Sequence, residues 1–239
     1  MDNIKLTEKA FAMKLKILEL AHGASPCGVH VGGALSCVEI LAVLTETANM
    51  SGKEDRDRIV LSKGHGSLGL YTALWQKGFI NESDLAEFDH DGGAFYAHPS
   101  RDISKGIEFS GGSLGLGISY AVGQAYVLKQ TGSPSSVYCI VGDGELDEGI
   151  VWEALMSAAN FRLDNLTVIV DCNKGQLDGP VDEVMSLGNL KKKFEAFGYD
   201  TIEINGHNFN EILSALTKST TDAPVSYTHL RAHETRSNL

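Results

Sequence analysis

The most constraining feature of the sequence is a strand–helix–strand unit over residues 137–173. Two segments, "VYCIV" at 137–141 and "LTVIVDCN" at 166–173, are apolar and rich in β-branched residues, which is typical of buried strands. Between them, "GIVWEALMSAANF" at 149–161 has helical periodicity. Two strands joined by a helical crossover of this length run parallel and are buried on both faces. The unit therefore predicts an α/β fold, a doubly wound, mostly parallel sheet with helices on both faces.

The rest of the chain continues this alternation and predicts one domain without internal repeats or linkers. Residues 7–22 read as an amphipathic helix in which Phe11, Leu15, Leu18 and Ala21 fall near helical spacing. The further expected elements are a strand at 58–62, a helix near 67–77, a loop rich in Gly, His and Asp at 89–112, a helix from Ser113 to about 130, and a final αβ-like portion at 190–219.

Two helix starts carry capping signals. Ser36 and Glu39 have the spacing of a capping box, which predicts a helix that begins near residue 36. Asn208 and Glu211 predict a similar start for the last helix.

Composition excludes several classes of function. A formal net charge of −11 and the lack of a Lys/Arg stripe argue against a nucleic acid or an anionic membrane as partner. No segment resembles a signal peptide, and no apolar run approaches the roughly 20 residues that span a bilayer. Cysteines at 27, 37, 139 and 172 form no CxxC pair, so we expect reduced thiols in a cytoplasmic protein.

Polar residues follow both strands of the central unit. Asp143 stands between Gly142 and Gly144 directly after the first strand, and Asn173 ends the second. Because ligands of open parallel sheets bind beyond the carboxyl ends of the strands, these side chains can meet in one crevice. Their oxygens suit Mg²⁺, while the glycines and the following helix N-terminus suit a phosphate. The pattern predicts a metal–diphosphate anchor, although Gly-Asp-Gly alone is more often a tight turn.

The same residues resemble the thiamine-diphosphate motif of the transketolase family, in which Gly-Asp-Gly is followed by Asn. The resemblance covers the chain to about residue 224. It is carried by "HVGGALS" at 30–36, "DRIVLSKGHGSLGLY" at 57–71, "AHPS" at 97–100, "GGSLGLGISYAVG" at 111–123, "GDGELDEG" at 142–149 and "NGH" at 205–207. The chain is most similar to the N-terminal, diphosphate-binding subunit of a transketolase made as two chains.

The resemblance implies a role for each matching position. Asp143, Asn173 and the backbone carbonyl of Gly175 match the Mg²⁺ ligands, and Gly142, Gly144, Gly112, Ser113 and Leu114 match cofactor contacts. His65 and His207 resemble histidines near the diphosphate, and His30 and His98 resemble those that contact the sugar and move protons on its hydroxyls. The usual Gly-His-Pro is Val-His-Val around His30. Glu148 matches an acid of the dimer interface that links two cofactor sites.

The implied reaction moves a two-carbon ketol unit from a ketose or its phosphate to an aldose, with thiamine diphosphate as the electron sink. The glutamate that acts on the aminopyrimidine ring belongs, in this family, to a pyrimidine-binding domain that these 239 residues do not contain. We therefore expect activity only with a C-terminal companion subunit, in a heterotetramer.

The C-terminal segment departs from the family pattern. Residues 225–239, "VSYTHLRAHETRSNL", are polar and resemble translated adapter or vector sequence. We expect a domain at 1–224 that is truncated and lacks its last strand, followed by a non-native tail at 225–239. Such a truncation would leave a sheet edge uncovered.

Three alternatives stay open at this stage. The chain could be a subunit of a related thiamine enzyme, either like deoxyxylulose-phosphate synthase or like a 2-oxo acid dehydrogenase. It could also be a non-catalytic remnant that only binds the cofactor. Finally, the natural gene could encode a single-chain transketolase rather than two subunits.

Overall fold

A computed structural model describes residues 2–24, 28–52, 55–217 and 223–230. Its centre is a sheet of five parallel strands in the order β1-β2-β3-β7-β6. The strands are β1 Arg58–Leu61, β2 Val137–Gly142, β3 Leu166–Cys172, β7 Val225–Leu230 and β6 Asp200–Asn205. The predicted parallel α/β sheet is therefore confirmed.

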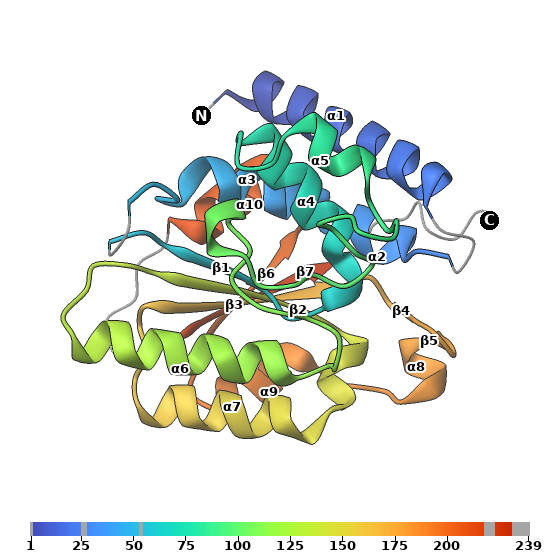
Figure 1. The fold of residues 1–239 in the computed structure, drawn as a ribbon. Helices are drawn as coiled ribbons and strands as arrows, with labels where there is room; N and C mark the ends of the chain where they lie inside the picture. Colours follow the sequence, from blue (N-terminus) through green and yellow to red (C-terminus); the bar gives the residue numbers. More distant parts are fainter. Residues whose placement is uncertain (1, 25–27, 53–54, 218–222, 231–239) are drawn as a thin grey trace.

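Helices cover both faces of the sheet, so that the protein has three layers (Figure 1). One face carries α1 Asn3–Gly23, α2 Val31–Leu35, α3 Val38–Thr47, α4 Ser67–Gln76, α5 Glu82–Ala86 and α10 Phe209–Leu216. The other carries α6 Leu116–Gln130, α7 Gly149–Asn160 and α9 Leu190–Ala196. The hairpin β4 Gly175–Gln176 and β5 Gly179–Pro180, with α8 Val181–Val184, projects beyond the end of β3. Short 3₁₀ turns are η1 Gly64–Gly66, η2 Ile103–Lys105 and η3 Gly144–Asp147.

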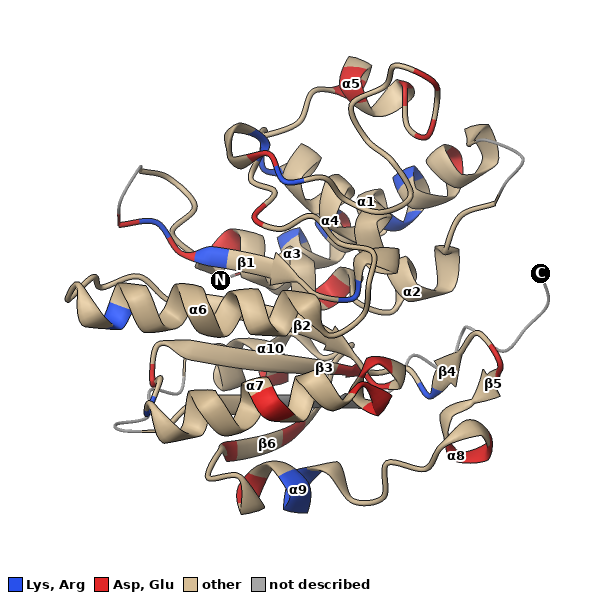
Figure 2. Cartoon of the chain, turned by 60° about the horizontal axis from the view of Figure 1, so that its bottom comes forward, with Lys and Arg blue, Asp and Glu red and all other residues tan. Residues whose placement is uncertain are grey.

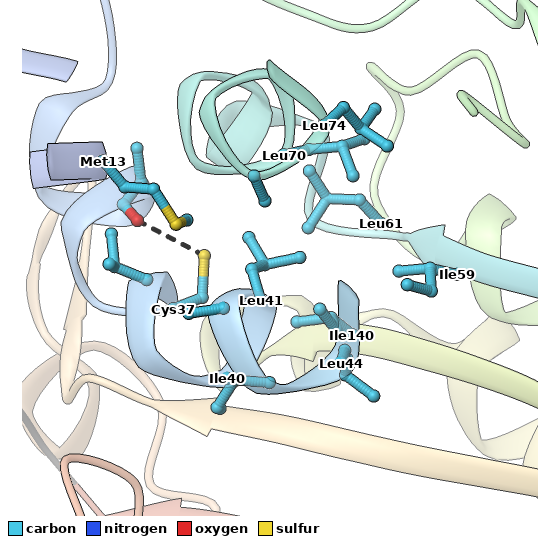
Figure 3. Close-up of a cluster of buried hydrophobic side chains, with 14 of the residues drawn as sticks. Met13, Cys37, Ile40, Leu41, Leu44, Ile59, Leu61, Leu70, Leu74 and Ile140 are labelled. Carbon is cyan, nitrogen blue, oxygen red and sulfur yellow. Dashed lines mark hydrogen bonds between the residues drawn. The ribbon is translucent and has the colours of Figure 1, made fainter. Parts of the chain in front are cut away.

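Each face of the sheet has its own hydrophobic core. Figure 3 shows the first, where Met13 of α1, Leu41 of α3 and Leu70 of α4 meet Ile140 of β2. The second core lies between the sheet and α6, α7 and α9, with Phe194 fully buried. Because successive residues of a strand point to opposite faces, β2 places Ile140 in the first core and Val141 in the second.

The first helix is confirmed, but it faces the core with a different side from the expected one. Its buried residues are Leu6, Ala10, Met13, Ile17 and Leu20. Phe11, Leu15 and Leu18, three of the four residues that indicated the helix, are 62%, 53% and 50% exposed, and only Ala21 is partly buried. The helix has two apolar stripes, and periodicity by itself cannot say which one faces the core.

One of the two predicted caps is wrong. α3 begins at Val38 after Cys37, without a side-chain cap. Ser36 and Glu39 are buried and used in tertiary contacts: Ser36 hydrogen-bonds Asp171, and Glu39 forms an ion pair with Lys14.

The second cap is confirmed. Asn208 accepts hydrogen bonds from the backbone N–H groups of Asn210 and Glu211 at the start of α10. The predicted helix from Ser113 begins three residues later, at Leu116, and the expected loop at 89–112 contains only η2 and an isolated bridge between Asp102 and Ile107.

The expectation that the last strand is missing is also wrong. β7 Val225–Leu230 lies inside the sheet, between β3 and β6, and pairs in parallel with both. Val225 and Ser226 are buried there although the segment is mostly polar. A central position supplies hydrogen bonds on both sides of the backbone, and these do not depend on side-chain polarity. The foreign origin of 225–239 stays a prediction, and residues 231–239 lie outside the described part.

Two composition-based expectations can be compared with the described residues. Cys37, Cys139 and Cys172 are buried free thiols, while Cys27 lies outside the described ranges. No helix within those ranges is long and apolar enough to cross a membrane.

Candidate functional site

A cavity of about 600 Å³ opens at the carboxyl ends of β1, β2 and β3. This is the edge at which ligands of open parallel sheets bind. Its lining includes ten of the thirteen predicted site residues: His30, His65, His98, Gly112, Leu114, Gly142, Asp143, Gly144, Asn173 and Gly175. The lining residues outside the prediction are Gly32, Gly33, Glu145, Gln176, Leu177 and Asp178.

Asp143 is the central acid of this cavity. Only 3% of it is exposed, and burial raises its pKa to about 6. Its Oδ2 accepts the Lys174 N–H at 2.7 Å and its Oδ1 accepts the Gly144 N–H at 3.0 Å. These bonds fix the carboxylate between the end of β2 and the start of the β4 hairpin.

Asn173 and Gly175 lie next to this carboxylate through an unusual backbone turn. Lys174 has a positive φ of 60°, a conformation that non-glycine residues adopt rarely and mostly in tight turns. The turn lets Asn173 Oδ1 accept the Gly175 N–H at 2.9 Å. A carboxylate, an amide oxygen and a backbone carbonyl form a set of hard oxygens, which suits Mg²⁺ or Ca²⁺ better than a soft metal.

Glycines bring backbone unusually close together around the cavity. A Cβ on Gly64 would come within 2.9 Å of the Gly112 nitrogen, and a Cβ on Gly33 within 2.6 Å of His65 Cδ2. A Cβ on Gly144 would lie 3.1 Å from the Gln176 Cβ. Side chains at these positions would fill the cavity or displace its walls, so the lining accepts a ligand that packs against bare backbone.

Three histidines form one cluster on the wall of the cavity. The ring centroid of His30 lies 5.7 Å from those of both His65 and His98. Burial, and then the charge on Lys63, lower the pKa of His65 to about 4. Burial, and then the charge on His98, also lower the pKa of His30. At neutral pH His65 and His30 are therefore uncharged and can both donate and accept hydrogen bonds.

A buried ion pair lies beneath the cavity. Lys63 and Asp171 are both fully buried, with Nζ and Oδ2 2.6 Å apart, and Ser36 also hydrogen-bonds Asp171. Burial alone would lower the pKa of Lys63, but the Asp171 carboxylate outweighs it and the pKa is raised. Figure 2 shows acidic residues gathered in the turn between β2 and α7, so Lys63 is a cation within an acidic edge of the sheet.

Glu145 was missed by the sequence analysis, although it directly follows Gly-Asp-Gly. It is 2% exposed, and burial raises its pKa. Its Oε1 accepts the Ser62 hydroxyl at 2.5 Å and the Gly115 N–H at 2.8 Å, and its Oε2 accepts the Gly142 N–H at 3.1 Å. Nothing in the local pattern separates it from the exposed acids that follow, because its partners come from distant segments.

Three predicted residues lie outside the lining. Ser113 and Glu148 are exposed, Glu148 as the residue that precedes α7. His207 follows β6 at the same edge of the sheet, but its Nδ1 lies 3.2 Å from Glu39 Oε2 and it does not line the cavity. The predicted cofactor and catalytic roles of His207 therefore have no support in this geometry, because the ring is held against α3.

The chemistry of this arrangement is specific in outline. Hard oxygens, open glycine backbone and the N-terminal end of a helix converge on one side of the cavity and suit a metal-bound phosphate group. Uncharged imidazoles on the other side can exchange protons with hydroxyl groups.

Known proteins with the same sequence pattern identify the family. The family described as "Transketolase, thiamine diphosphate binding domain" matches residues 7–227. One of the two subunits of the apulose-4-phosphate transketolase from Actinobacillus succinogenes is 39% identical over 217 residues, which cover 89% of this chain and 78% of the relative. The 6-deoxy-6-sulfo-D-fructose transketolase subunit SqwG of a Clostridium species is 42% identical over 195 residues, which cover 80% of this chain and 71% of the relative.

A solved structure agrees with these matches. Transketolase from Campylobacter jejuni superposes with a TM-score of 0.86 at 32% identity, over 95% of this chain and 38% of that one. Human transketolase is 36% identical over 215 residues, which are 34% of its length. The chain thus spans little more than a third of these two transketolases, within their N-terminal region. The chain belongs to the transketolase family, as a member of its thiamine-diphosphate-binding domain.

Proposed function

We propose that this chain is the N-terminal subunit of a transketolase that works with a separate companion chain. The observation that carries the proposal is the convergence of Asp143, Asn173, Gly175 and the three-histidine cluster on one cavity. Relatives named as transketolase subunits, of which the chain covers 78% and 71%, support the two-chain arrangement.

The metal would be held by the Asp143 carboxylate, the Asn173 amide oxygen and the Gly175 carbonyl. Their fit is supported by the hydrogen bonds that fix Asp143 and by the turn at Lys174, which keeps Asn173 and Gly175 beside it. One carboxylate with two neutral oxygens leaves coordination positions for phosphate oxygens and water, as Mg²⁺ prefers.

Thiamine diphosphate would bind with its diphosphate against Gly142, Gly144 and His65, and with the loop of Gly112 and Leu114 beside it. When bound, this cofactor supplies the electron sink for breaking a carbon–carbon bond next to a carbonyl. The protein's own part is to hold the diphosphate on backbone N–H groups and to keep His65 neutral, so that it can donate a hydrogen bond.

The substrate class that we propose is a ketose donor and an aldose acceptor, each with an anionic end. The two relatives are named for apulose-4-phosphate and 6-deoxy-6-sulfo-D-fructose, which carry a phosphate and a sulfonate. His30 and His98 would bind the sugar hydroxyls and move their protons. The companion chain would carry the pyrimidine-binding domain, and Glu148 would lie at the contact between two copies of the assembly.

The experiment compares the wild-type chain with Asp143→Asn and with the control Asp91→Asn, which changes an exposed acid. Calorimetric titration with thiamine diphosphate and Mg²⁺ should give saturable binding for the wild type and the control. The Asp143 variant should lose at least a hundredfold in affinity, because the amide offers the metal no charge and opposes the Lys174 N–H.

Mixing the chain with its companion should then restore transfer of a two-carbon unit between sugars, as seen by product analysis. Wild-type binding without Mg²⁺, or binding that Asp143→Asn leaves unchanged, would refute the metal assignment. Decarboxylation of a 2-oxo acid instead of sugar transfer would refute the proposed reaction.

A further inference from the structure

We infer that Glu145 is a positioning residue, which holds the Gly112–Leu114 loop against the strand ends so that the cofactor's diphosphate meets a preformed site. The inference rests on the proposed function, because it concerns the same cavity. Glu145 matches none of the roles that the family resemblance implies for the neighbouring residues.

The contacts of Glu145 join four segments of the chain. The carboxylate accepts Ser62 from the end of β1, Gly115 from the loop before α6 and Gly142 from the end of β2, while its own backbone lies in η3. Ser62 Oγ in turn accepts the Ile118 N–H at 3.0 Å. We call these residues, Ser62, Gly115, Ile118, Gly142 and Glu145, the clasp.

The clasp needs a carboxylate in this place. The three groups that bond to it are donors, and two of them are backbone N–H groups that cannot rotate away. A buried ionised carboxylate is costly unless donors satisfy its oxygens, and here they do on both oxygens. An amide of the same shape would turn an N–H₂ group toward a donor on one side or the other, and would break at least one bond.

The loop that the clasp holds has little freedom to relax. Gly115 has a left-handed φ of 79°, and a Cβ there would collide with Ile150 Cγ2. Gly117 approaches β1 so closely that a Cβ would lie 2.5 Å from the Ser62 Cα. Gly112 and Leu114, which line the cavity, come immediately before this fixed point, so the clasp sets where they stand.

The position of Glu145 in the cavity wall connects the clasp to ligand binding. Three of the segments that it joins end at the cavity, through Gly112, Gly142 and Gly144. A site fixed before binding does not spend binding free energy on ordering its loops. Loss of the clasp should therefore weaken cofactor binding beyond its effect on folding.

The test uses the full chain and three variants: Glu145→Gln, Ser62→Ala and the control Glu108→Gln. Glu108 is also a buried acid, 3% exposed, but it pairs with Arg56 and does not line the cavity. Three quantities are measured on each protein: the melting temperature, the Kd for thiamine diphosphate at saturating Mg²⁺, and amide hydrogen exchange of residues 112–118 without ligand.

Glu145→Gln should raise the Kd at least tenfold and speed exchange at residues 112–118 at least tenfold. Ser62→Ala should raise the Kd at least threefold, because it removes one bond of the clasp. Glu108→Gln should lower the melting temperature while leaving the Kd and the exchange of this loop within twofold of wild type.

A Kd for Glu145→Gln within twofold of wild type overturns the inference, as does an equal increase in Glu108→Gln. If Glu145→Gln does not fold, Ser62→Ala decides, and an unchanged Kd in that variant overturns the inference. If the wild-type chain binds no thiamine diphosphate, the proposed function fails and the inference falls with it. Wild-type binding with insensitive variants refutes the inference alone.

Discussion

Separating the buried pair beneath the cavity should cost a large part of the protein's stability. Lys63 and Asp171 are both 0% exposed to water, with Nζ and Oδ2 2.6 Å apart. Lys63→Met keeps the length of the side chain and removes the ammonium, while Asp171→Asn keeps the shape and removes the charge. Either change leaves one buried charge without its partner.

The expected magnitude follows from burial. Breaking a buried ion pair by removing one partner costs about 3–5 kcal/mol, against a typical total stability of about 5–15 kcal/mol. The double variant removes both charges, so it should cost less than the sum of the two single variants by at least about 2 kcal/mol. Because the pKa of Lys63 is raised, this stabilisation is fully present at neutral pH and is lost only as the pH rises through that pKa.

Urea unfolding at pH 7 measures the four free energies of this cycle. The control is the pair Lys129–Asp164, which has an N–O distance of 2.7 Å but side chains that are 31% and 37% exposed. Lys129→Met should cost no more than about 1 kcal/mol, because water screens exposed pairs. Costs below about 1 kcal/mol at Lys63 and Asp171, or strictly additive costs in the double variant, would show that the pair does not hold the floor of the site.

Three further predictions concern the site and the first helix. Between pH 7 and pH 5 the unfolding free energy should fall by about 1–2 kcal/mol more in the wild type than in His65→Gln, since the folded pKa of about 4 lies below the unfolded value of about 6.5 and the unfolded chain takes up the proton first; equal slopes in urea titrations would contradict the buried, neutral ring. Gly33→Ala should leave the melting temperature within a few degrees but reduce thiamine diphosphate affinity at least tenfold, because the new Cβ would lie 2.6 Å from His65 Cδ2, whereas Gly149→Ala meets nothing within 4 Å and should bind as the wild type does. Met13→Ala should cost about 2–5 kcal/mol by chemical denaturation and Leu15→Ala less than about 1 kcal/mol, and the reverse order would mean that the other stripe of α1 faces the core.

Local patterns predicted those parts of the fold that local forces specify. The strands on either side of α7 were predictable because runs of β-branched residues strongly favour buried strands, and a crossover of that length leaves a parallel pairing as the simple solution. Asp143 and Asn173 were predictable as neighbours for the same reason, since parallel strands bring their carboxyl ends to one edge. Asn208 was predictable as a cap because its bonds reach only two and three residues along the chain.

Long-range contacts decided what the patterns could not. Ser36 and Glu39 have the spacing of a capping box, yet Asp171 and Lys14, distant in sequence, take their side chains. His207 lies in a loop typical of a binding site, but Glu39 holds its ring outside the cavity. β7 is polar and has no strand signal of its own, and its place between β3 and β6 comes from backbone pairing on both sides.

The sequence by itself determined the parallel α/β architecture, the metal and diphosphate motif and the family, because each depends on residue types at short spacing or at strand ends. Only the tertiary structure decided which stripe of α1 is buried, that Lys63 and Asp171 neutralise each other beneath the site, and that Glu145 joins three strand and loop ends. Those contacts connect residues between 3 and 108 positions apart, and a carboxylate acquires its role there from the donors that the fold brings to it.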